Sequence, residues 1–152
     1  MGSVEVIDLK KQEHLIRQYV DLRNSYADLL LTHPVTLTET KEWLTHKDVE
    51  VRCLIENGVL LGAAILYLSR GGEIAFFARD PNKGLGGELL NIIETVALKR
   101  GLKAVWAWAL EHNEIAQKVF ERNGYIKKET PEIKVYNQED YRGIVFRKAL
   151  IR

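Results

Sequence analysis

The spacing of apolar residues changes several times along the first third of the chain, and each change predicts a new element. Residues 4–9 (VEVIDL) alternate apolar and charged side chains, which is typical of a half-buried strand. From residue 11 to about residue 31 apolar residues recur at helical spacing, and Pro34 ends this helical region. Thr36 is followed three residues later by a glutamate, the spacing of a capping box, which predicts a short helix through Leu44.

Strands rich in apolar residues follow. Residues 50–57 and 59–69 are predicted to form a hairpin around an Asn-Gly turn, and a glycine turn leads into a further strand over residues 73–79. Two adjacent strands this dense in apolar side chains indicate the middle of a sheet that is covered on both faces.

The second half of the chain alternates helices and strands by the same criteria. The predicted segments are a helix ended by Gly101, a strand over residues 104–110, a helix ended by Asn123-Gly124, and strands over residues 125–129 and 142–150. A polar connection joins the last two strands. Because no repeat or linker interrupts the chain, the sequence predicts one mixed α/β domain over residues 1–152.

Composition narrows the class of protein. The 152 residues suffice for one domain with a substantial core, and the formal net charge of +1 comes without blocks of like charge, so we expect no nucleic-acid partner. Cys53 is the sole cysteine, which excludes an internal disulfide. The first residues lack the apolar core of a signal peptide, and no apolar run approaches the ~20 residues of a membrane helix. We expect a cytoplasmic protein that does not bind membranes.

Residues 80–87 (DPNKGLGG) place three glycines between a predicted strand and a predicted helix. The first amide N–H groups of a helix are unpaired and lie at the positive end of its dipole, so such a site attracts phosphate. Glycine lets the backbone approach the anion closely, and Lys83 could add a positive charge beside it.

The known kinds of phosphate-binding loop match this pattern to different degrees. The mononucleotide loop needs Gly-Lys-Ser/Thr, but Lys83 precedes the first glycine and no Ser or Thr follows. The dinucleotide fingerprint needs a glycine where Leu89 stands. A mid-chain Gly-x-Gly-x loop for a pyrophosphate matches, and a turn without any ligand is still open at this point.

A second motif, Asn-x-x-Ala-x-x-x-aromatic-x-x-x-Gly-aromatic, is formed by Asn113, Ala116, Phe120, Gly124 and Tyr125. Together with the glycine loop it resembles the GNAT superfamily of acyl-CoA-dependent N-acyltransferases, over nearly the whole chain. The resemblance implies a mixed, mostly antiparallel sheet of six to seven strands flanked by about four helices. It also implies that acetyl-CoA is the cofactor and that a primary amine attacks its thioester directly.

The resemblance assigns coenzyme A to the glycine loop, to the backbone of the strand before it and to the helix of the second motif. The positions are Phe77, Ala78, Arg79, Asn82, Lys83, Gly84, Leu85, Gly86, Gly87, Asn113, Ala116, Phe120 and Arg122. Two of them depart from the family pattern. Pro81 stands where an Arg or Gln is usual, in a loop that is shorter than usual. Phe120 stands where a tyrosine commonly protonates the leaving thiolate, and a phenylalanine has no proton to donate.

Three groups are candidates for the chemistry. Glu73 begins the central strand where the family often places its base, His112 precedes the second motif, and Glu111 is a weaker third. The backbone N–H of Phe77 is the predicted oxyanion donor. Glu73 and His112 could equally be solvated side chains without a chemical task. The histidines show no metal-ligand spacing, so no metal is predicted.

The acceptor pocket is expected from the first two helices. Its candidate residues are Arg23, Asn24, Tyr26, His33 and Thr36. Trp106 and Trp108 share one face of their strand and are interpreted as core side chains, with substrate stacking as the alternative. The acceptor could be an amino-sugar nucleotide, a protein N-terminus or a small amine, and a homodimer is compatible with the sequence. The competing functions are an acyl-CoA-binding sensor without turnover and a nucleotide-binding regulator.

Overall fold

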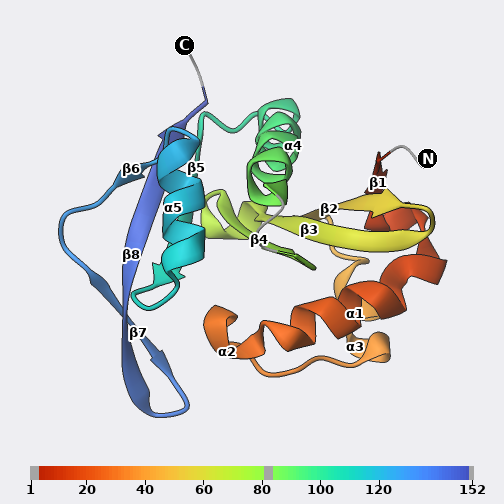
Figure 1. Ribbon diagram of the computed structural model, residues 1–152, viewed down its shortest axis with the longest axis horizontal. Coiled ribbons are helices and arrows are strands. Elements are labelled where there is room, and N and C mark those ends of the chain that lie inside the picture. Colours follow the sequence, from red (N-terminus) through yellow and green to blue (C-terminus); the bar gives the residue numbers. More distant parts are fainter. Residues whose placement is uncertain (1–3, 81–83, 151–152) are drawn as a thin grey trace.

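The computed structural model describes residues 4–80 and 84–150, and within them one sheet carries all strands (Figure 1). The strands run in the order β1-β2-β3-β4-β5-β8-β6, and β7 pairs with β8. All pairs are antiparallel except β4 and β5. The strands are β1 (Glu5–Asp8), β2 (Val49–Glu56), β3 (Val59–Tyr67), β4 (Glu73–Ala78), β5 (Ala104–Leu110), β6 (Ile126–Lys127), β7 (Glu132–Tyr136) and β8 (Glu139–Ala149).

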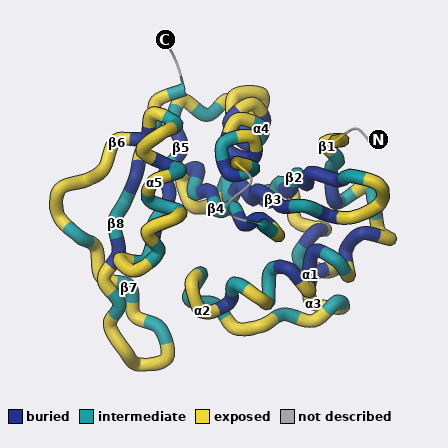
Figure 2. Tube along the Cα trace, in the orientation of Figure 1, coloured by how far each residue is buried: buried dark blue, intermediate teal, exposed yellow. Residues whose placement is uncertain are grey.

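Helices cover the sheet on both sides. They are α1 (Ile16–Ser25), α2 (Ala27–Leu30), α3 (Leu37–Trp43), α4 (Leu85–Lys99) and α5 (Glu114–Arg122). The apolar stripe of α4 packs with Phe120 of α5 and Phe146 of β8 in one core cluster. A second cluster joins Tyr19 of α1 to the opposite face of β2, β3 and β4. Figure 2 shows both clusters as buried segments on either side of β3 and β4. The predicted mixed α/β fold is confirmed.

Strands β4 and β5 are joined only at their beginning. Glu73 pairs with Trp106, and the Trp106 N–H donates to the Gly72 carbonyl at 3.1 Å. No further residue pair of these two strands is in register along the described chain, although β4 continues to Ala78. The strands therefore diverge and open a gap in the middle of the sheet.

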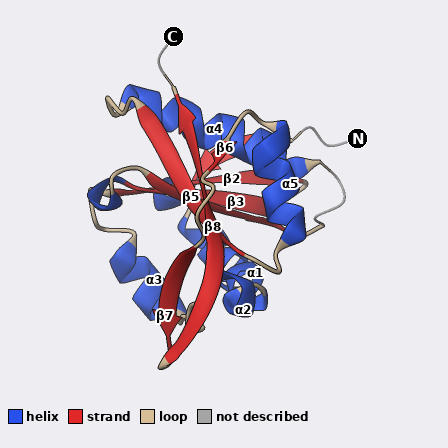
Figure 3. Ribbon diagram, turned by 90° about the vertical axis from the view of Figure 1, so that its left-hand side faces the viewer, coloured by secondary structure: helices blue, strands red, loops and turns tan. Residues whose placement is uncertain are grey.

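The C-terminal part differs from the predicted pattern. The strand expected over residues 125–129 shortens to β6, and the polar connection contains β7, which forms a hairpin with β8 (Figure 3). The hairpin turns at Asn137 and Gln138, whose φ angles are 52° and 65°. Such a turn needs two left-handed residues, a conformation that favours Asn and Gly over Gln, so the sequence lacks the usual turn signal. The long N-terminal helix is also divided, because Tyr26 separates α1 from α2.

The two tryptophans of β5 are not core residues, contrary to the sequence-based interpretation. They do share one face, but that face is half-buried, and the alternate residues Val105, Ala107 and Ala109 point into the core. Their indole N–H groups donate to backbone carbonyls, Trp106 to Arg70 at 2.9 Å and Trp108 to Glu132 at 3.1 Å. Trp108 lies flat against Gly143 of β8, where a Cβ would come within 2.0 Å of the ring.

Candidate active site

The backbone of β4 presents hydrogen-bonding groups to the gap at every second residue. Just beyond the strand, the Arg79 N–H donates to the Leu61 carbonyl of the β3 side at 2.7 Å. Phe77, two residues earlier and paired with Ala63, therefore also directs its N–H at β3. Phe76 and Ala78 face the gap instead. The predicted oxyanion donor is corrected accordingly: the Phe77 N–H is used inside the sheet, and those of Phe76 and Ala78 are directed at the opening.

Four cavities follow one another from the N-terminus of α4 through this gap. The outer cavity, about 410 Å³, includes Gly84, Gly87, Lys118 and Arg122. The slot, about 210 Å³, lies between Ala78 and Ala116, and the central cavity, about 260 Å³, includes Glu73 and Phe120. The inner cavity, about 230 Å³, includes Tyr19 and Trp43.

Neighbouring cavities share lining residues, so the four form a series of adjoining cavities, termed the path. The outer cavity and the slot share Gly86 and Val119. The slot and the central cavity share Phe76 and Asn113. The shared residues of the central and inner cavities are Arg23, Tyr67 and Arg70. The path thus runs from a helix N-terminus, past the open edge of β4, to a pocket beneath α1 and α3.

The outer end of the path is suited to an anion. Helix α4 begins after Gly84, which has φ 73° and, as a glycine, has no side chain with which to cap the first turn. Lys118 and Arg122 lie one helical turn apart on the neighbouring α5. Gly86 has a packing role here, because a Cβ on it would come within 2.9 Å of Val119. The N-terminus of α4, the positive end of its dipole, and two cations therefore share one cavity. The predicted ligands Asn82 and Lys83 lie outside the described residues.

Tyr26 and Asn113 form two sides of the slot. The Tyr26 hydroxyl donates to the Ala78 carbonyl at 2.6 Å, and its ring stacks on Phe77 with centroids 6.0 Å apart. Burial raises the pKa of Tyr26, and the Asp80 carboxylate adds to the shift, so the hydroxyl keeps its proton. Asn113 caps α5 by accepting from the Ala116 N–H at 3.3 Å. The slot is narrow and mostly apolar, with polar groups along the edge of β4.

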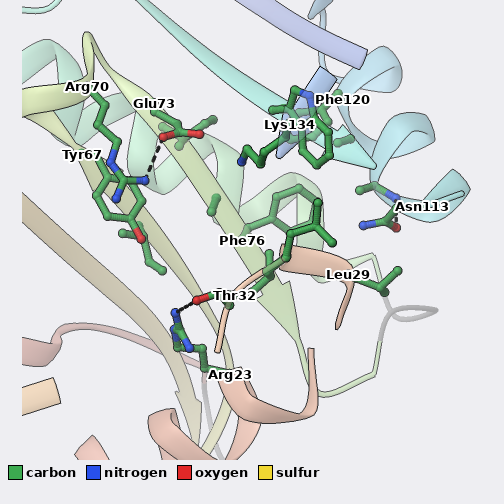
Figure 4. A pocket seen from close by; sticks show the side chains of 18 residues that line it. Arg23, Leu29, Thr32, Tyr67, Arg70, Glu73, Phe76, Asn113, Phe120 and Lys134 are labelled. Carbon is green, nitrogen blue, oxygen red and sulfur yellow. Dashed lines mark hydrogen bonds and ion pairs between the residues drawn. The ribbon is translucent and has the colours of Figure 1, made fainter. Parts of the chain in front are cut away.

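The central cavity brings an acidic group to the open gap. Glu73 pairs with Arg70 at 3.1 Å, and its side chain is 12% exposed (Figure 4). Phe120 lines the same cavity and is 3% exposed. Its ring packs edge-on against Phe76 at 5.4 Å and stacks on Phe146 at 5.2 Å. The cavity therefore joins one carboxylate to an apolar aromatic wall.

The sequence model of the acetyltransferase (GNAT) family matches residues 16–125. The chain belongs to the GNAT family. No curated protein matches its sequence significantly. Solved structures share its fold at low sequence identity. One is yncA from Salmonella typhimurium, with its cofactor acetyl-CoA. It has a TM-score of 0.81 at 16% identity, and the match covers 99% of this chain and 95% of that one. Spermidine N-acetyltransferase from Vibrio cholerae, in complex with CoA and spermine, has a TM-score of 0.81 at 13% identity, covering 97% and 95%.

A third neighbour, N-acetyltransferase from Staphylococcus aureus, has a TM-score of 0.82 at 16% identity and covers 98% of this chain and 99% of that one. Acetyl-CoA, expected from the sequence, is thus the cofactor of this GNAT family. None of the helices that the structure describes is long and apolar enough to cross a membrane.

The predicted catalytic candidates of this GNAT protein lie in different places. Glu73 lines the central cavity. His112 is exposed at the start of the α5 region and lines none of the described cavities. Glu111 is also exposed and pairs with Arg142 at 3.2 Å. Geometry thus favours Glu73 among the three.

Some of the predicted acceptor residues line the cavities, and others have structural roles outside them. Arg23 lines the central and inner cavities, and Tyr26 lines the slot. Asn24 holds the backbone of Val35 through two hydrogen bonds of 2.9 Å, and Thr36 caps α3 through the expected capping box.

His33 joins the loop before α3 to the β7–β8 hairpin. Its Nδ1 lies 3.2 Å from the Tyr136 hydroxyl, and the two rings are 5.1 Å apart. Lys134, on the same hairpin, reaches the central cavity. The hairpin that the sequence did not predict therefore forms one side of the site.

The sequence also does not single out the inner cavity. Tyr19, Trp43 and Tyr67 belong to the apolar stripes of their elements, which look like ordinary core positions. Burial raises the pKa of Tyr19 and Tyr67, so both hydroxyls keep their protons. Arg70 stands three residues before Glu73 in a turn, and this spacing is the one signal that could have indicated it.

Proposed function

We propose that this GNAT protein is an N-acetyltransferase that moves the acetyl group of acetyl-CoA to a primary amine by direct attack on the thioester. The observation that carries the proposal is the series of adjoining cavities, which leads from the N-terminus of α4 past the open edge of β4 to the carboxylate of Glu73 at the start of that strand. An extended acyl-CoA needs an anion site at one end and a reaction site at the other, and the path offers both.

The cofactor would enter from α4. Its pyrophosphate would bind the first amides of α4, with Lys118 and Arg122 placed to neutralise further phosphate charge. The pantetheine arm would lie in the slot along β4, where Phe76 and Ala78 direct backbone groups at the gap. This orientation puts the thioester at Phe76, which the slot shares with the central cavity.

The chemistry requires a proton acceptor and a site for developing negative charge. In the proposed step the amine nitrogen bonds to the thioester carbon, the amine loses a proton, and the carbon–sulfur bond breaks to release a thiolate. The Phe76 N–H is the donor best placed to stabilise the oxyanion. Glu73 would accept the amine proton through water, because it is the carboxylate of the central cavity.

A coupled assay of thiol release tests both parts of the proposal. Purified protein is incubated with acetyl-CoA and a panel of primary amines, and the acetylated amine is identified by mass spectrometry. We expect Glu73→Gln to lower kcat/KM at pH 7 by about 10²–10⁴-fold, the contribution of a positioned base. The deficit should shrink as the pH approaches the amine pKa of ~10, because the deprotonated amine needs no base.

Glu129→Gln is the matched control, since Glu129 is exposed in the loop before β7 and lines none of the described cavities. Coenzyme A affinity should be equal in the wild type and both variants. Coenzyme A binding without acetylation of any amine would contradict the enzymatic function and favour an acyl-CoA-binding module. An unchanged pH profile in a folded Glu73→Gln variant would exclude Glu73 as the base.

A further inference from the structure

The inner cavity has no part in the transfer chemistry, yet it is built from specific side chains. Tyr19 stacks on Trp43 with ring centroids 6.2 Å apart, and Trp43 packs against Tyr67 at 6.1 Å. These rings come from α1, α3 and β3 and give the cavity aromatic walls. The cavity adjoins the central cavity through Arg23, Tyr67 and Arg70, so an acceptor bound at Glu73 could extend into it.

The Tyr19 hydroxyl supplies an unused hydrogen-bond donor. Its residue is fully buried, and no group in the described part of the chain meets the oxygen at hydrogen-bond distance and angle. Burial raises the pKa of the hydroxyl, although the Arg23 guanidinium lies near enough to lower it in part. A buried hydroxyl without a partner is destabilising, and nearly all such groups in folded proteins are satisfied. Tyr19 lines the inner cavity, but its oxygen is shielded from solvent in this structure, so a ligand that accepts a hydrogen bond would satisfy it only after a small shift of the neighbouring side chains.

Arg23 supplies an unpaired positive charge at the same place. Its guanidinium donates to the Thr32 Oγ1 at 2.8 Å and to the His33 carbonyl at 3.3 Å, which are both neutral. The two bonds fix the orientation of the side chain, and Figure 4 shows the one to Thr32. No carboxylate pairs with Arg23 among residues 4–80 and 84–150. A guanidinium presents five N–H donors, so further ones are free for a ligand.

The carboxylates of the two cavities already have partners. Glu73 is paired with Arg70, and the Glu39 Oε1 accepts from the Thr36 N–H at 3.0 Å in the capping box. Across the central cavity, the Lys134 ammonium lies over the Trp108 ring at 4.5 Å. The acceptor side of the site therefore carries an excess of positive charge.

We propose that the acceptor is a small amine that also carries a carboxylate, and that Arg23 and the Tyr19 hydroxyl bind this carboxylate at the boundary of the inner cavity. The inference rests on the proposed function and names its substrate class. A carboxylate matches both groups at once, because it accepts a charged hydrogen bond from a guanidinium and a second bond from a hydroxyl. Its amine would then point toward Glu73, and the aromatic walls would contact the apolar part of the molecule.

The same charges disfavour a polyamine. A second ammonium group would have to lie beside Arg23 and Lys134 without a free carboxylate to receive it, and like charges placed together weaken binding. The structure therefore predicts discrimination between amines of equal length by the charge at their far end.

Matched amine pairs test this inference. Each pair consists of an amino acid and the amine that remains when its carboxylate is removed, such as phenylalanine and phenethylamine, and ω-amino acids vary the separation of the two groups. We expect kcat/KM to favour the carboxylate-bearing member by about tenfold or more, as for a charged hydrogen bond. Arg23→Gln should abolish most of this preference, because it should lower kcat/KM much more for the carboxylate-bearing member of each pair than for its decarboxylated partner. Arg17→Gln, an exposed position on the same helix, should retain the wild-type preference.

Tyr19→Phe gives a second variant with an independent readout. Removing an unpartnered buried hydroxyl should leave the unliganded protein at least as stable in urea unfolding, while KM for the carboxylate-bearing amine rises a few-fold and kcat stays unchanged. A clear loss of stability would show that the hydroxyl has a structural partner and would overturn its role in binding.

Calorimetric titration of the coenzyme A complex with each amine separates the two proposals. Acetylation of amines without preference for the carboxylate would overturn this inference alone. Carboxylate-dependent binding without turnover would support the inference and overturn the enzymatic function. Neither binding nor turnover of any carboxylate-bearing amine would overturn the inference, and if the plain amines also fail, the proposed function as well.

Discussion

The hydroxyl of Tyr26 holds the carbonyl that the cofactor would be expected to use, and its removal should strengthen coenzyme A binding. The 2.6 Å bond to the Ala78 carbonyl occupies a group that faces the gap between β4 and β5. If a pantetheine amide donates to this carbonyl, it must displace the tyrosine hydroxyl. Tyr26→Phe removes that competitor and keeps the ring that stacks on Phe77.

The expected change in the dissociation constant follows from the free energy that one neutral hydrogen bond contributes. Such a bond contributes about 0.5–1.5 kcal/mol, which corresponds to a roughly 2- to 13-fold change in a dissociation constant. Isothermal titration should therefore give a Kd for coenzyme A that is lower by this factor in Tyr26→Phe. The unliganded variant should be less stable by a similar free energy in urea unfolding, because the Ala78 carbonyl loses its partner.

Tyr141→Phe is the control for this comparison. Its hydroxyl donates to the Glu139 carboxylate at 3.0 Å on the exposed hairpin, so coenzyme A affinity should not change. Weaker binding in Tyr26→Phe would mean that the hydroxyl contacts the cofactor itself. Equal binding would mean that the Ala78 carbonyl has no role in holding the cofactor. Either result refutes the reasoning.

Two further predictions concern the leaving group and the core. If thiolate departure limits the rate, Phe120→Tyr should raise kcat by at most about 10²–10⁴-fold. Because Phe120 is buried, a new hydroxyl without a partner should lower the free energy of unfolding by about 1–3 kcal/mol. Turnover and urea unfolding of the same preparation measure the two effects. An unchanged kcat in a folded variant would show that another step is limiting. Burial raises the pKa of the Cys53 thiol from 9.0 to about 12, so the unfolded chain loses this proton at lower pH than the folded one. Stability should therefore fall above pH 9 by about 1.4 kcal/mol per pH unit from this group. Urea unfolding between pH 8 and 11 should show a shallower decline for Cys53→Ala, and equal slopes would contradict the assignment.

Local signals in the sequence predict the elements well where one residue type determines the backbone. The capping box at Thr36 is present with both of its hydrogen bonds. The Asn-Gly hairpin turn is present with φ angles of 51° at Asn57 and 76° at Gly58. Such features depend on neighbouring residues alone, so sequence spacing suffices. The hairpin of β7 and β8 was missed because Gln138 adopts a left-handed conformation that its side chain does not favour.

Features that depend on distant parts of the chain could not be obtained in this way. Whether the N–H of Phe77 or of Phe76 faces the gap depends on the register of β4 against β3, and a shift of one residue exchanges them. The inner cavity depends on three elements meeting, and an aromatic residue on an apolar stripe is usually a core residue. Only the assembled structure shows that, among residues 4–80 and 84–150, no group meets the Tyr19 hydroxyl at hydrogen-bond distance and angle.

The positive charge in the central cavity is relevant to the absence of a tyrosine at position 120. Phe120 belongs to an aromatic cluster with Phe76 and Phe146, and this packing leaves no proton donor at the position where the GNAT resemblance places one. A thiol with a pKa of ~8.5 leaves as a thiolate without a full proton transfer, so what it needs most is stabilisation of negative charge. Lys134 lines the same cavity as Phe120, and its ammonium is held over Trp108 rather than by a carboxylate. On the proposed function, the positive charge of Lys134 would stabilise the departing thiolate, as that of Arg23 would stabilise the carboxylate of the proposed acceptor. On this reasoning the gain from Phe120→Tyr lies at the low end of its range, because the positive charge already supplies part of what an acid would.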